Sequence, residues 1–374
     1  MLVFLFFVSL VFVMKYKVSI VIPVYNVGKY LETAFNSIRN QTIGFNNLEV
    51  IMVNDCSSDN SGRIIDKYAK KYDNCVAIHL EENSGAAGRP RNVAIENASS
   101  DYIMFLDPDD YYEKDACKIL YNEIVKEDKD IVFGGFIKKK GINISRNNFK
   151  WLEGETNIGK IDDNIEILFL APSLPSKIVK REFLIKNNIK FLENVPGQDS
   201  VFIVEVLFNA KGIKFLKSIY IYTYLYRDDS ITNILTLKYF KGAMFSLKER
   251  YYLYKKYGKE EYFKIHSDRY LNFFLPKVLL TDMDSEEEFK EILEYMEWFI
   301  NKCVEIGSKP KSDKLLLLFN FMVKKDIENI LVYKKVYNYY IKGSIKRIAR
   351  LQSTKGWVLY KKSNIIKRIK KRFF

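Results

Sequence analysis

The feature that most constrains the fold is an alternation of short apolar runs with helical segments in the first part of the chain. Each apolar run has the length of one strand, and segments with helical spacing stand between the runs. This alternation is typical of an α/β protein whose parallel strands are joined by helices. The runs read as strands are Val18–Asn26 (with the loop that follows), Leu48–Val53, Val76–Leu80 and Tyr102–Leu106, and the helical segments are Lys29–Arg39, Arg63–Tyr72 and Arg91–Asn97.

The sequence pattern of the remaining chain changes twice. A helix over Lys114–Lys126 and a strand over Asp130–Phe136 continue the α/β pattern, whereas residues 138–160 are polar and irregular. Ile213–Tyr226 predicts a late strand, and beyond Leu237 the spacing is helical. The sequence therefore predicts an α/β domain over residues 15–236, followed by a mostly α-helical region over 237–374.

Residues 1–14 form a separate apolar segment. A spanning helix needs about 20 such residues, and this run is shorter and has no signal-peptide cleavage pattern. We favour Met14 as the true start, with the first 13 residues as upstream translation; the alternative is a short membrane anchor.

Polar loops follow all four predicted strands. In parallel sheets, ligands bind beyond the carboxyl ends of the strands, which places residues 23–26, 55–61, 83–88 and 107–110 at one edge. Neither GxGxxG nor GxxxxGK[ST] is present, so no dinucleotide fingerprint or P-loop is indicated. Asp107, Asp109 and Asp110 crowd one loop, and a divalent cation would offset their mutual repulsion. The plain alternative is a solvated acidic turn.

The net charge of +14 lies in the last segment of the chain. Residues 329–374 hold 14 of the 60 Lys and Arg residues and none of the 46 acids, so the rest is balanced. Ile365, Ile366, Ile369 and Phe373 share a helical arc among basic residues, which predicts a tail bound to an anionic membrane surface. A solvated basic tail is the alternative, and no nucleic-acid motif is present. The four scattered cysteines indicate neither a zinc site nor a disulfide framework.

Five motifs in order resemble a family 2 glycosyltransferase of the GT-A fold. They are Val18–Asn26, Val53–Ser61, Gly88–Asn92, Asp101–Asp110 and Gly197–Phe202. The pair Gly88-Arg89-Pro90-Arg91-Asn92 and Pro196-Gly197-Gln198-Asp199 is similar to bacterial enzymes that build or decorate teichoic acids, capsules and other surface glycans.

The resemblance implies a role for each matching residue. Pro23, Val24 and Tyr25 would line the nucleobase pocket, and Asp55 would accept a hydrogen bond from the base. Asp107 and Asp109 match the DxD motif, with Asp107 near the ribose and Asp109 holding Mn²⁺ or Mg²⁺ on the diphosphate. Arg89 or Arg91 would contact the nucleotide, and Arg227 would belong to a segment that closes over the diphosphate. Asp199 would be the general base.

Two positions depart from the family pattern. The loop after the second strand reads Asn54-Asp55-Cys56-Ser57 in place of an acid or Asn before Asp-Gly-Ser, and the base motif reads Gln198-Asp199 in place of Glu-Asp. Each departure keeps the Asp carboxylate that the chemistry needs. The second departure, Gln198 in place of Glu, bears on which acceptor the enzyme uses. Asp199 also has a structural alternative. The apolar spacing predicts a helix over Val201–Phe208, and an Asp just before a helix is a good N-cap.

These observations predict an inverting, metal-dependent glycosyltransferase. It would move a sugar from a nucleotide-diphosphate sugar, expected to be a UDP-sugar, to a hydroxyl of a surface polysaccharide, teichoic-acid-like or lipid-linked acceptor. We expect it to be cytoplasmic and peripheral at the inner face of the cell membrane, with homo-oligomer formation left open. The alternatives are a nucleotidyltransferase that makes sugar nucleotides and a non-catalytic membrane-associated scaffold.

Overall fold

The computed structural model describes residues 16–146, 156–163, 167–170, 174–227, 235–281 and 285–338. Within these residues the chain divides into two compact units. The first ends at residue 234 and resumes over 242–260, and the second comprises residues 235–241 and those from 261 onward. The apolar segment 1–14 and the amphipathic tail after residue 338 lie outside the described residues, so their predictions stay predictions.

The first unit contains one mixed sheet. Its strands are β1 (Val18–Val24), β2 (Leu48–Asn54), β3 (Cys75–His79), β4 (Tyr102–Phe105), β5 (Tyr111–Tyr112), β6 (Ile131–Lys140), β7 (Asn143–Arg146), β8 (Thr156–Ile158), β9 (Lys177–Lys180) and β10 (Ile213–Leu225). Among the described residues their order is β3-β2-β1-β4-β9-β6-β10-β5, with β7 on β6 and β8 on β10. The pairs among β1 to β4 are parallel, and β9 runs antiparallel to both β4 and β6.

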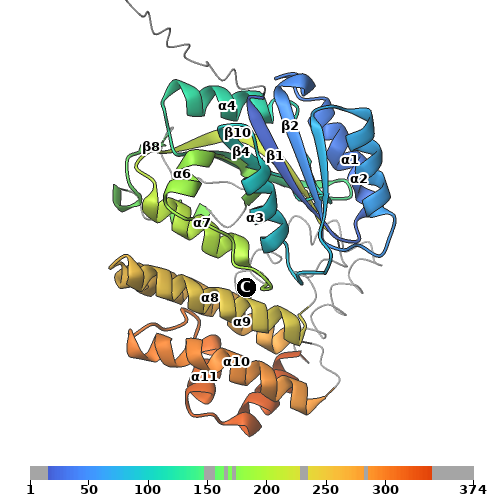
Figure 1. The fold of residues 1–374 in the computed structure, drawn as a ribbon. Coiled ribbons are helices and arrows are strands. Elements are labelled where there is room, and N and C mark those ends of the chain that lie inside the picture. Colours follow the sequence, from blue (N-terminus) through green and yellow to red (C-terminus); the bar gives the residue numbers. More distant parts are fainter. Residues whose placement is uncertain are drawn as a thin grey trace, which may run out of the picture. The chain divides into compact units, whose positions relative to one another are not determined.

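Helices connect these strands and make up the second unit. The described helices are α1 (Gly28–Arg39), α2 (Ser61–Lys71), α3 (Gly88–Asn97), α4 (Ala116–Lys126), α5 (Ile167–Leu170), α6 (Arg181–Lys186), α7 (Gln198–Asn209), α8 (Leu237–Lys256), α9 (Glu260–Leu280), α10 (Glu286–Glu305) and α11 (Asp313–Val323). Figure 1 shows α6 and α7 next to α3 on one side of the sheet. The predicted fold class, an α/β domain followed by helices, is confirmed.

The sheet buries an apolar layer on each of its faces. One layer joins alternate residues of β1, among them Ile20 and Ile22, to α1, α2 and α4, and it includes Met104 of β4. The next residue of β4, Phe105, points to the opposite face because side chains alternate along a strand. There it meets Phe191 and Phe202, whose rings stack at 3.8 Å. The second layer therefore fixes α7 on the sheet.

The polar stretch predicted to be irregular is partly strand. β6 continues to Lys140, and β7 pairs back on it from Asn143 after a turn in which Gly141 has φ +56°. The turn requires positive φ, which glycine adopts without a steric penalty. The side chains of β7 are all exposed, so this hairpin has no apolar alternation from which a strand could be predicted.

The second unit is a helical assembly with its own core. Phe274 of α9 and Phe299 of α10 contact edge to face at 6.3 Å, and both are buried. Ser285 caps α10 by accepting a hydrogen bond from the Glu288 backbone N–H. Within the described ranges, no helix is both long enough and apolar enough to cross a bilayer.

Candidate active site

The loops after β1 and β2 are joined at the carboxyl edge of the sheet. Pro23 and Val24 end β1 as buried residues, and the side chain of Tyr25 is 50% exposed just beyond them. The backbone N–H of Asp55 donates to the Val24 carbonyl at 2.8 Å. This hydrogen bond places the predicted nucleobase residues of both loops beside one another, with the Tyr25 ring available to a ligand.

The Asp55 carboxylate is buried and held by three donors from the loop after β3. It accepts hydrogen bonds from the backbone N–H and the hydroxyl of Ser84, each at 2.9 Å, and from the Asn83 amide at 3.2 Å. Only 3% of Asp55 is exposed. Because both carboxylate oxygens are engaged, the side chain cannot rotate freely and presents a fixed acceptor at this edge.

The start of α1 is tied to the loop after β2. The Gly28 N–H donates to the Asp59 carboxylate at 3.0 Å, and the Val27 N–H donates to the Ser61 hydroxyl at 2.9 Å. These acceptors satisfy N–H groups that a helix start would otherwise leave unpaired. A Cβ on Gly28 would lie 1.9 Å from the Asn60 amide oxygen, so the close approach of the two loops requires glycine there.

Each of the three acidic side chains after β4 has a different partner. Asp107 accepts a hydrogen bond from Arg91 at 2.7 Å, and Asp109 forms an ion pair with Arg227. Asp110 is buried and accepts hydrogen bonds from the Tyr222 hydroxyl and, at 2.7 Å, from the Leu225 N–H. The plain alternative of a solvated acidic turn is therefore wrong, since all three carboxylates are engaged.

Asp110 has a structural role in this loop. Burial, and next the charge of Asp107, raise the pKa of the Asp110 carboxyl to about 7. A carboxyl with such a pKa is partly protonated near neutral pH, which relieves the repulsion among the three acids. Asp110 thereby anchors the loop to β10 and leaves Asp107 and Asp109 to face the site.

The structure distinguishes between the two arginines of α3. Arg91 is buried, and its guanidinium also lies 5.4 Å from the centroid of the Phe191 ring. Its buried Nε has no hydrogen-bond partner among the described residues. Arg89 instead points to a surface pair with Glu82 at 3.3 Å. Arg91, and not Arg89, is therefore the basic residue brought to the acidic loop.

Asp199 lies in the first turn of α7 and does not cap it. The N-cap is Gly197, which has φ +80°, and no side chain makes a capping hydrogen bond there. The structural alternative for Asp199 is thus wrong: the helix begins at Gln198, three residues earlier than the apolar spacing predicted. Burial raises the pKa of the Asp199 carboxyl, while the charge of Arg91 lowers it and that of Asp107 raises it. These shared charges place Asp199 in the same site as the acidic loop.

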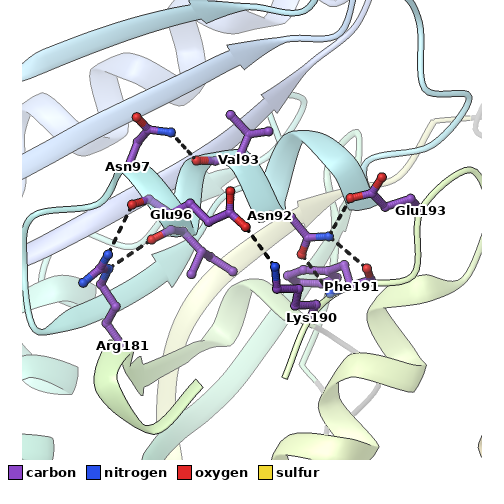
Figure 2. Close-up of polar contacts among 9 residues, drawn as sticks. Asn92, Val93, Glu96, Asn97, Arg181, Lys190, Phe191 and Glu193 are labelled. Carbon is purple, nitrogen blue, oxygen red and sulfur yellow. Dashed lines mark hydrogen bonds and ion pairs between the residues drawn. The ribbon is translucent and has the colours of Figure 1, made fainter. Parts of the chain in front are cut away.

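Two contacts of α3 hold the segment that leads to Asp199. Gly88 approaches that segment so closely that a Cβ would lie 2.0 Å from the Leu192 carbonyl oxygen. Asn92 donates to the Phe191 carbonyl at 2.9 Å and to Glu193 at 3.1 Å, and its amide oxygen accepts from the Phe191 N–H at 2.9 Å (Figure 2). The Gly88–Asn92 motif therefore positions residues 191–193, and through them the start of α7.

Sequence reasoning missed one charged residue at this site, Lys177. It is the first residue of β9, and none of its side chain is exposed. The charge of Asp199 acts on its ammonium group. A basic residue at the start of a short strand gives no sequence signal of burial.

The acidic loop can supply some, but not all, of the ligands of a metal ion. Asp107 and Asp109 offer the carboxylate oxygens that hard cations take, whereas Asp110 is committed to Tyr222 and Leu225. Across the described ranges, no three or more metal-ligating side chains gather into a cluster. The donor set fits a cation held by one or two carboxylates together with substrate phosphate oxygens, which is a usual mode for Mg²⁺.

A mostly parallel sheet with acidic loops at the carboxyl ends of its strands defines the class of protein as GT-A type. Residues 19–176 match the family model described as Glycosyl transferase family 2, so the chain contains a domain of this family. The resemblance noted in the sequence is confirmed.

Two curated relatives are named as poly(ribitol-phosphate) glycosyltransferases. The chain is 32% identical over 333 residues to a poly(ribitol-phosphate) beta-glucosyltransferase of Bacillus spizizenii, covering 85% of this chain and 50% of that protein. It is 28% identical to the poly(ribitol-phosphate) beta-N-acetylglucosaminyltransferase TarS of Staphylococcus aureus, covering 88% and 57%. The chain thus spans about half the length of these relatives.

A solved structure shares the fold over most of the chain. The crystal structure of S. aureus TarS 1–349 in complex with UDP-GlcNAc matches with a TM-score of 0.67 at 24% identity, covering 86% of this chain and 91% of that one. At this identity the likeness establishes the fold, so the roles of the side chains rest on their geometry here.

Proposed function

We propose that this chain is an inverting glycosyltransferase that moves a sugar from a UDP-sugar to a hydroxyl of a poly(ribitol-phosphate) or similar surface polymer. The observation that carries the proposal is the convergence of Asp55, Asp107, Asp109 and Asp199, from three separate segments, at the carboxyl edge of one sheet. The charges of Arg91 and Asp107 both act on Asp199. This supports one shared site for the acidic loop after β4 and the proposed base, Asp199.

On the donor side, the loops after β1 and β2 would hold the nucleobase. Pro23, Val24 and the half-exposed Tyr25 give the pocket an apolar wall, and Asp55 offers a fixed acceptor for an N–H of uracil. Arg227 lies at the same edge, paired with Asp109, where its guanidinium can meet a diphosphate oxygen. A UDP-sugar supplies both groups that this arrangement would bind.

The chemistry needs a base and a way to stabilise the leaving diphosphate. Asp199 in its ionised form would take the proton of the acceptor hydroxyl as it attacks the anomeric carbon, and the sugar–phosphate bond would break on the opposite face. A cation held at Asp109, Mn²⁺ or Mg²⁺, would supply charge stabilisation for the diphosphate when bound. Arg227 and Arg91 add positive charge from the protein itself.

Two considerations support inversion and a polymer acceptor. One carboxylate base, Asp199, suffices for a single displacement at the anomeric carbon. The relatives are named as beta-transferases acting on poly(ribitol-phosphate), and the TarS crystal contains UDP-GlcNAc. A UDP-sugar with an α-linked leaving group gives a β-product by one displacement.

We further propose that the enzyme works at the cytoplasmic face of the membrane as a peripheral protein. Support comes from the sequence, since residues 329–374 carry 14 basic and no acidic side chains and anionic lipid attracts such segments. Binding of the purified chain to vesicles with and without an anionic lipid, at low and high salt, tests this proposal.

The central experiment combines donor binding with transfer. Nucleotide sugars are first screened by thermal stabilisation with Mn²⁺, with Mg²⁺ and with a chelator, because a ligand that binds the folded state raises its apparent stability. The stabilising donor is then incubated with poly(ribitol phosphate), with poly(glycerol phosphate) as the matched polymer, and UDP release and the anomeric configuration of the product are measured.

We expect UDP release that depends on the polymer, a β-linked product, and loss of transfer with retained donor binding in Asp199→Asn. Turnover by Asp199→Asn at the wild-type rate would remove Asp199 from the mechanism. Pyrophosphate release from a sugar phosphate and a nucleoside triphosphate would instead identify a nucleotidyltransferase, and absence of donor binding would favour a scaffold.

A further inference from the structure

A buried glutamine lies next to the proposed base with part of its amide unpaired. Gln198 is the first residue of α7, directly before Asp199, and only 6% of it is exposed. Its amide oxygen accepts a hydrogen bond from the Asp199 backbone N–H at 3.3 Å. The amide nitrogen, Nε2, has no hydrogen-bond partner among the described residues. Because an unpaired polar group in a buried position costs free energy, this nitrogen calls for an oxygen from outside the chain.

The amide nitrogen of Gln198 is within reach of a ligand. Nε2 is not among the fully enclosed side-chain atoms that lack a partner in the described ranges. It therefore keeps part of its surface open, although the residue as a whole is almost entirely covered. An oxygen that arrives with a substrate can accept a hydrogen bond from it.

Contacts with two glycines and two serines hold the Gln198 side chain in place. A Cβ on Gly88 of α3 would lie 3.3 Å from Cγ of Gln198, so the side chain lies against the start of α3. The carbonyl of Gly197, the residue before, accepts hydrogen bonds from the hydroxyls of Ser200 at 2.9 Å and Ser246 at 3.1 Å. With its own oxygen bound to the Asp199 N–H, the amide is fixed in orientation before a substrate arrives.

The position of Gln198 selects the acceptor, and not the nucleotide, as its substrate. The groups proposed to hold the nucleotide and the diphosphate lie on the loops after β2 and β4, whereas Gln198 adjoins Asp199 in α7. The substrate group that must meet Asp199 is the acceptor hydroxyl. A hydroxyl oxygen can accept a hydrogen bond from an amide while its proton is donated to a carboxylate. Gln198 and Asp199 together therefore match both functions of an alcohol.

We propose that Gln198 is a specificity-determining residue for the acceptor: its Nε2 donates a hydrogen bond to a hydroxyl oxygen of the polymer and so seats the attacking hydroxyl against Asp199. This inference rests on the proposed function, in which Asp199 is the base. An ionised glutamate at this position would offer only acceptor oxygens, and it would add negative charge where a phosphate-bearing polymer must approach. The neutral amide suits an acceptor that is both anionic and rich in hydroxyls.

The test compares two buried glutamines whose amides are used differently. Gln198→Met removes the amide at nearly constant length, and Gln198→Glu replaces the donor by a carboxylate of the same shape. Gln41→Met is the matched control, because Gln41 is 4% exposed and fully paired. Its amide donates to the carbonyls of Ser37 at 3.0 Å and Glu113 at 2.8 Å, and accepts from the Cys117 N–H at 2.9 Å.

For each variant, the KM for poly(ribitol phosphate) and the KM for the UDP-sugar are measured above neutral pH, where a glutamate is ionised. Thermal stabilisation by the UDP-sugar is the test of folding. We expect Gln198→Met to raise the KM for the polymer about three- to tenfold, the range that one neutral hydrogen bond gives, with little change in the KM for the UDP-sugar. Gln198→Glu should raise the KM for the polymer further, because it adds charge repulsion.

Gln41→Met should show the opposite pattern, with a lower melting temperature and the wild-type KM for the polymer. A folded Gln198→Met or Gln198→Glu variant with the wild-type KM for the polymer would overturn the proposal. A rise in the KM for the UDP-sugar alone would place the Gln198 amide on the donor and would overturn it as well.

A second measurement uses a chain that keeps Gln198. The side-chain amides of isotope-labelled glutamine are followed by NMR in Asp199→Asn with UDP bound, while poly(ribitol phosphate) is added. We expect the resonance of Gln198 to move and that of Gln41 to stay, and an unmoved Gln198 resonance would contradict the contact. Wild-type turnover in Asp199→Asn would defeat the proposed function, whereas an inactive Asp199→Asn whose Gln198 amide does not respond to the polymer would defeat this inference alone.

Discussion

Asn92 gives a sharp test of how α3 positions the base. Its side chain makes three hydrogen bonds to the segment before α7, two of them with the backbone of Phe191. Asn97, on the same helix, donates only to the Val93 carbonyl at 2.8 Å, from an exposed position (Figure 2). Asn92→Ala and Asn97→Ala are therefore the same chemical change with different structural consequences.

The expected magnitudes follow from these contacts. Asn92→Ala leaves the buried N–H and C=O of Phe191 without their partner, and an unsatisfied buried polar group costs about 1–3 kcal/mol. We expect a loss of roughly 2–4 kcal/mol in the free energy of unfolding of the first unit, allowing for partial relaxation. Asn97→Ala should lie within about 0.5 kcal/mol of the wild type, as exposed substitutions usually do.

Urea unfolding followed by circular dichroism measures the free energy of unfolding, and the steady-state rate of sugar transfer measures the effect on the site. Asn92→Ala should lower kcat beyond any loss of folded protein, because residues 191–193 lead directly into the helix that carries Asp199. If Asn92→Ala and Asn97→Ala unfolded at the same urea concentration with the same slope, the positioning role assigned to Asn92 would be wrong.

Three further predictions concern single positions. Asp109→Asn should weaken Mn²⁺-dependent binding of the UDP-sugar while leaving metal-free binding unchanged, as measured by calorimetry with and without chelator. Gly88→Ala should lower both thermal stability and kcat, because its Cβ would meet the Leu192 carbonyl at 2.0 Å; wild-type values for both would contradict this. The lowered pKa of Lys177 means that the unfolded chain binds more protons than the folded one between about pH 7 and 10.5. The wild type should therefore gain stability relative to Lys177→Met as pH rises from 7 to 9, by at most about 1.4 kcal/mol per pH unit in urea unfolding.

The fold could be predicted from the sequence where apolar periodicity is strong. The strands that became β1 to β4 and the helices between them lie within a few residues of their predicted bounds, since their burial follows directly from the apolar pattern. The start of α7 was misplaced because Gln198 and Asp199 are polar, although the helix already begins there. The exposed end of β6 and the whole of β7 were missed because the side chains of β7 are all exposed.

The site could be predicted as a set of residues but not as a set of pairings. Strand ends meet at one edge of a parallel sheet, and this brought Asp55 and Asp107 together in advance. Asp199 was assigned to the site through the family resemblance. The choice of Arg91 over Arg89 depends on which side of α3 faces Asp107, and only the folded structure shows this. Lys177 could not be found because a lysine at the start of a short strand gives no sequence signal of burial.

The pairings explain how so many acidic groups can share one edge of the sheet. Asp107 has Arg91 and Asp109 has Arg227, each basic partner coming from a different element. An arriving UDP-sugar brings further negative charge, so positive charge must already be in place or arrive with it. Arg227 and a divalent cation would bind the same carboxylate, Asp109. A cation bound there would leave the Arg227 guanidinium available to the diphosphate. The positive charge that serves the leaving group can therefore change during turnover.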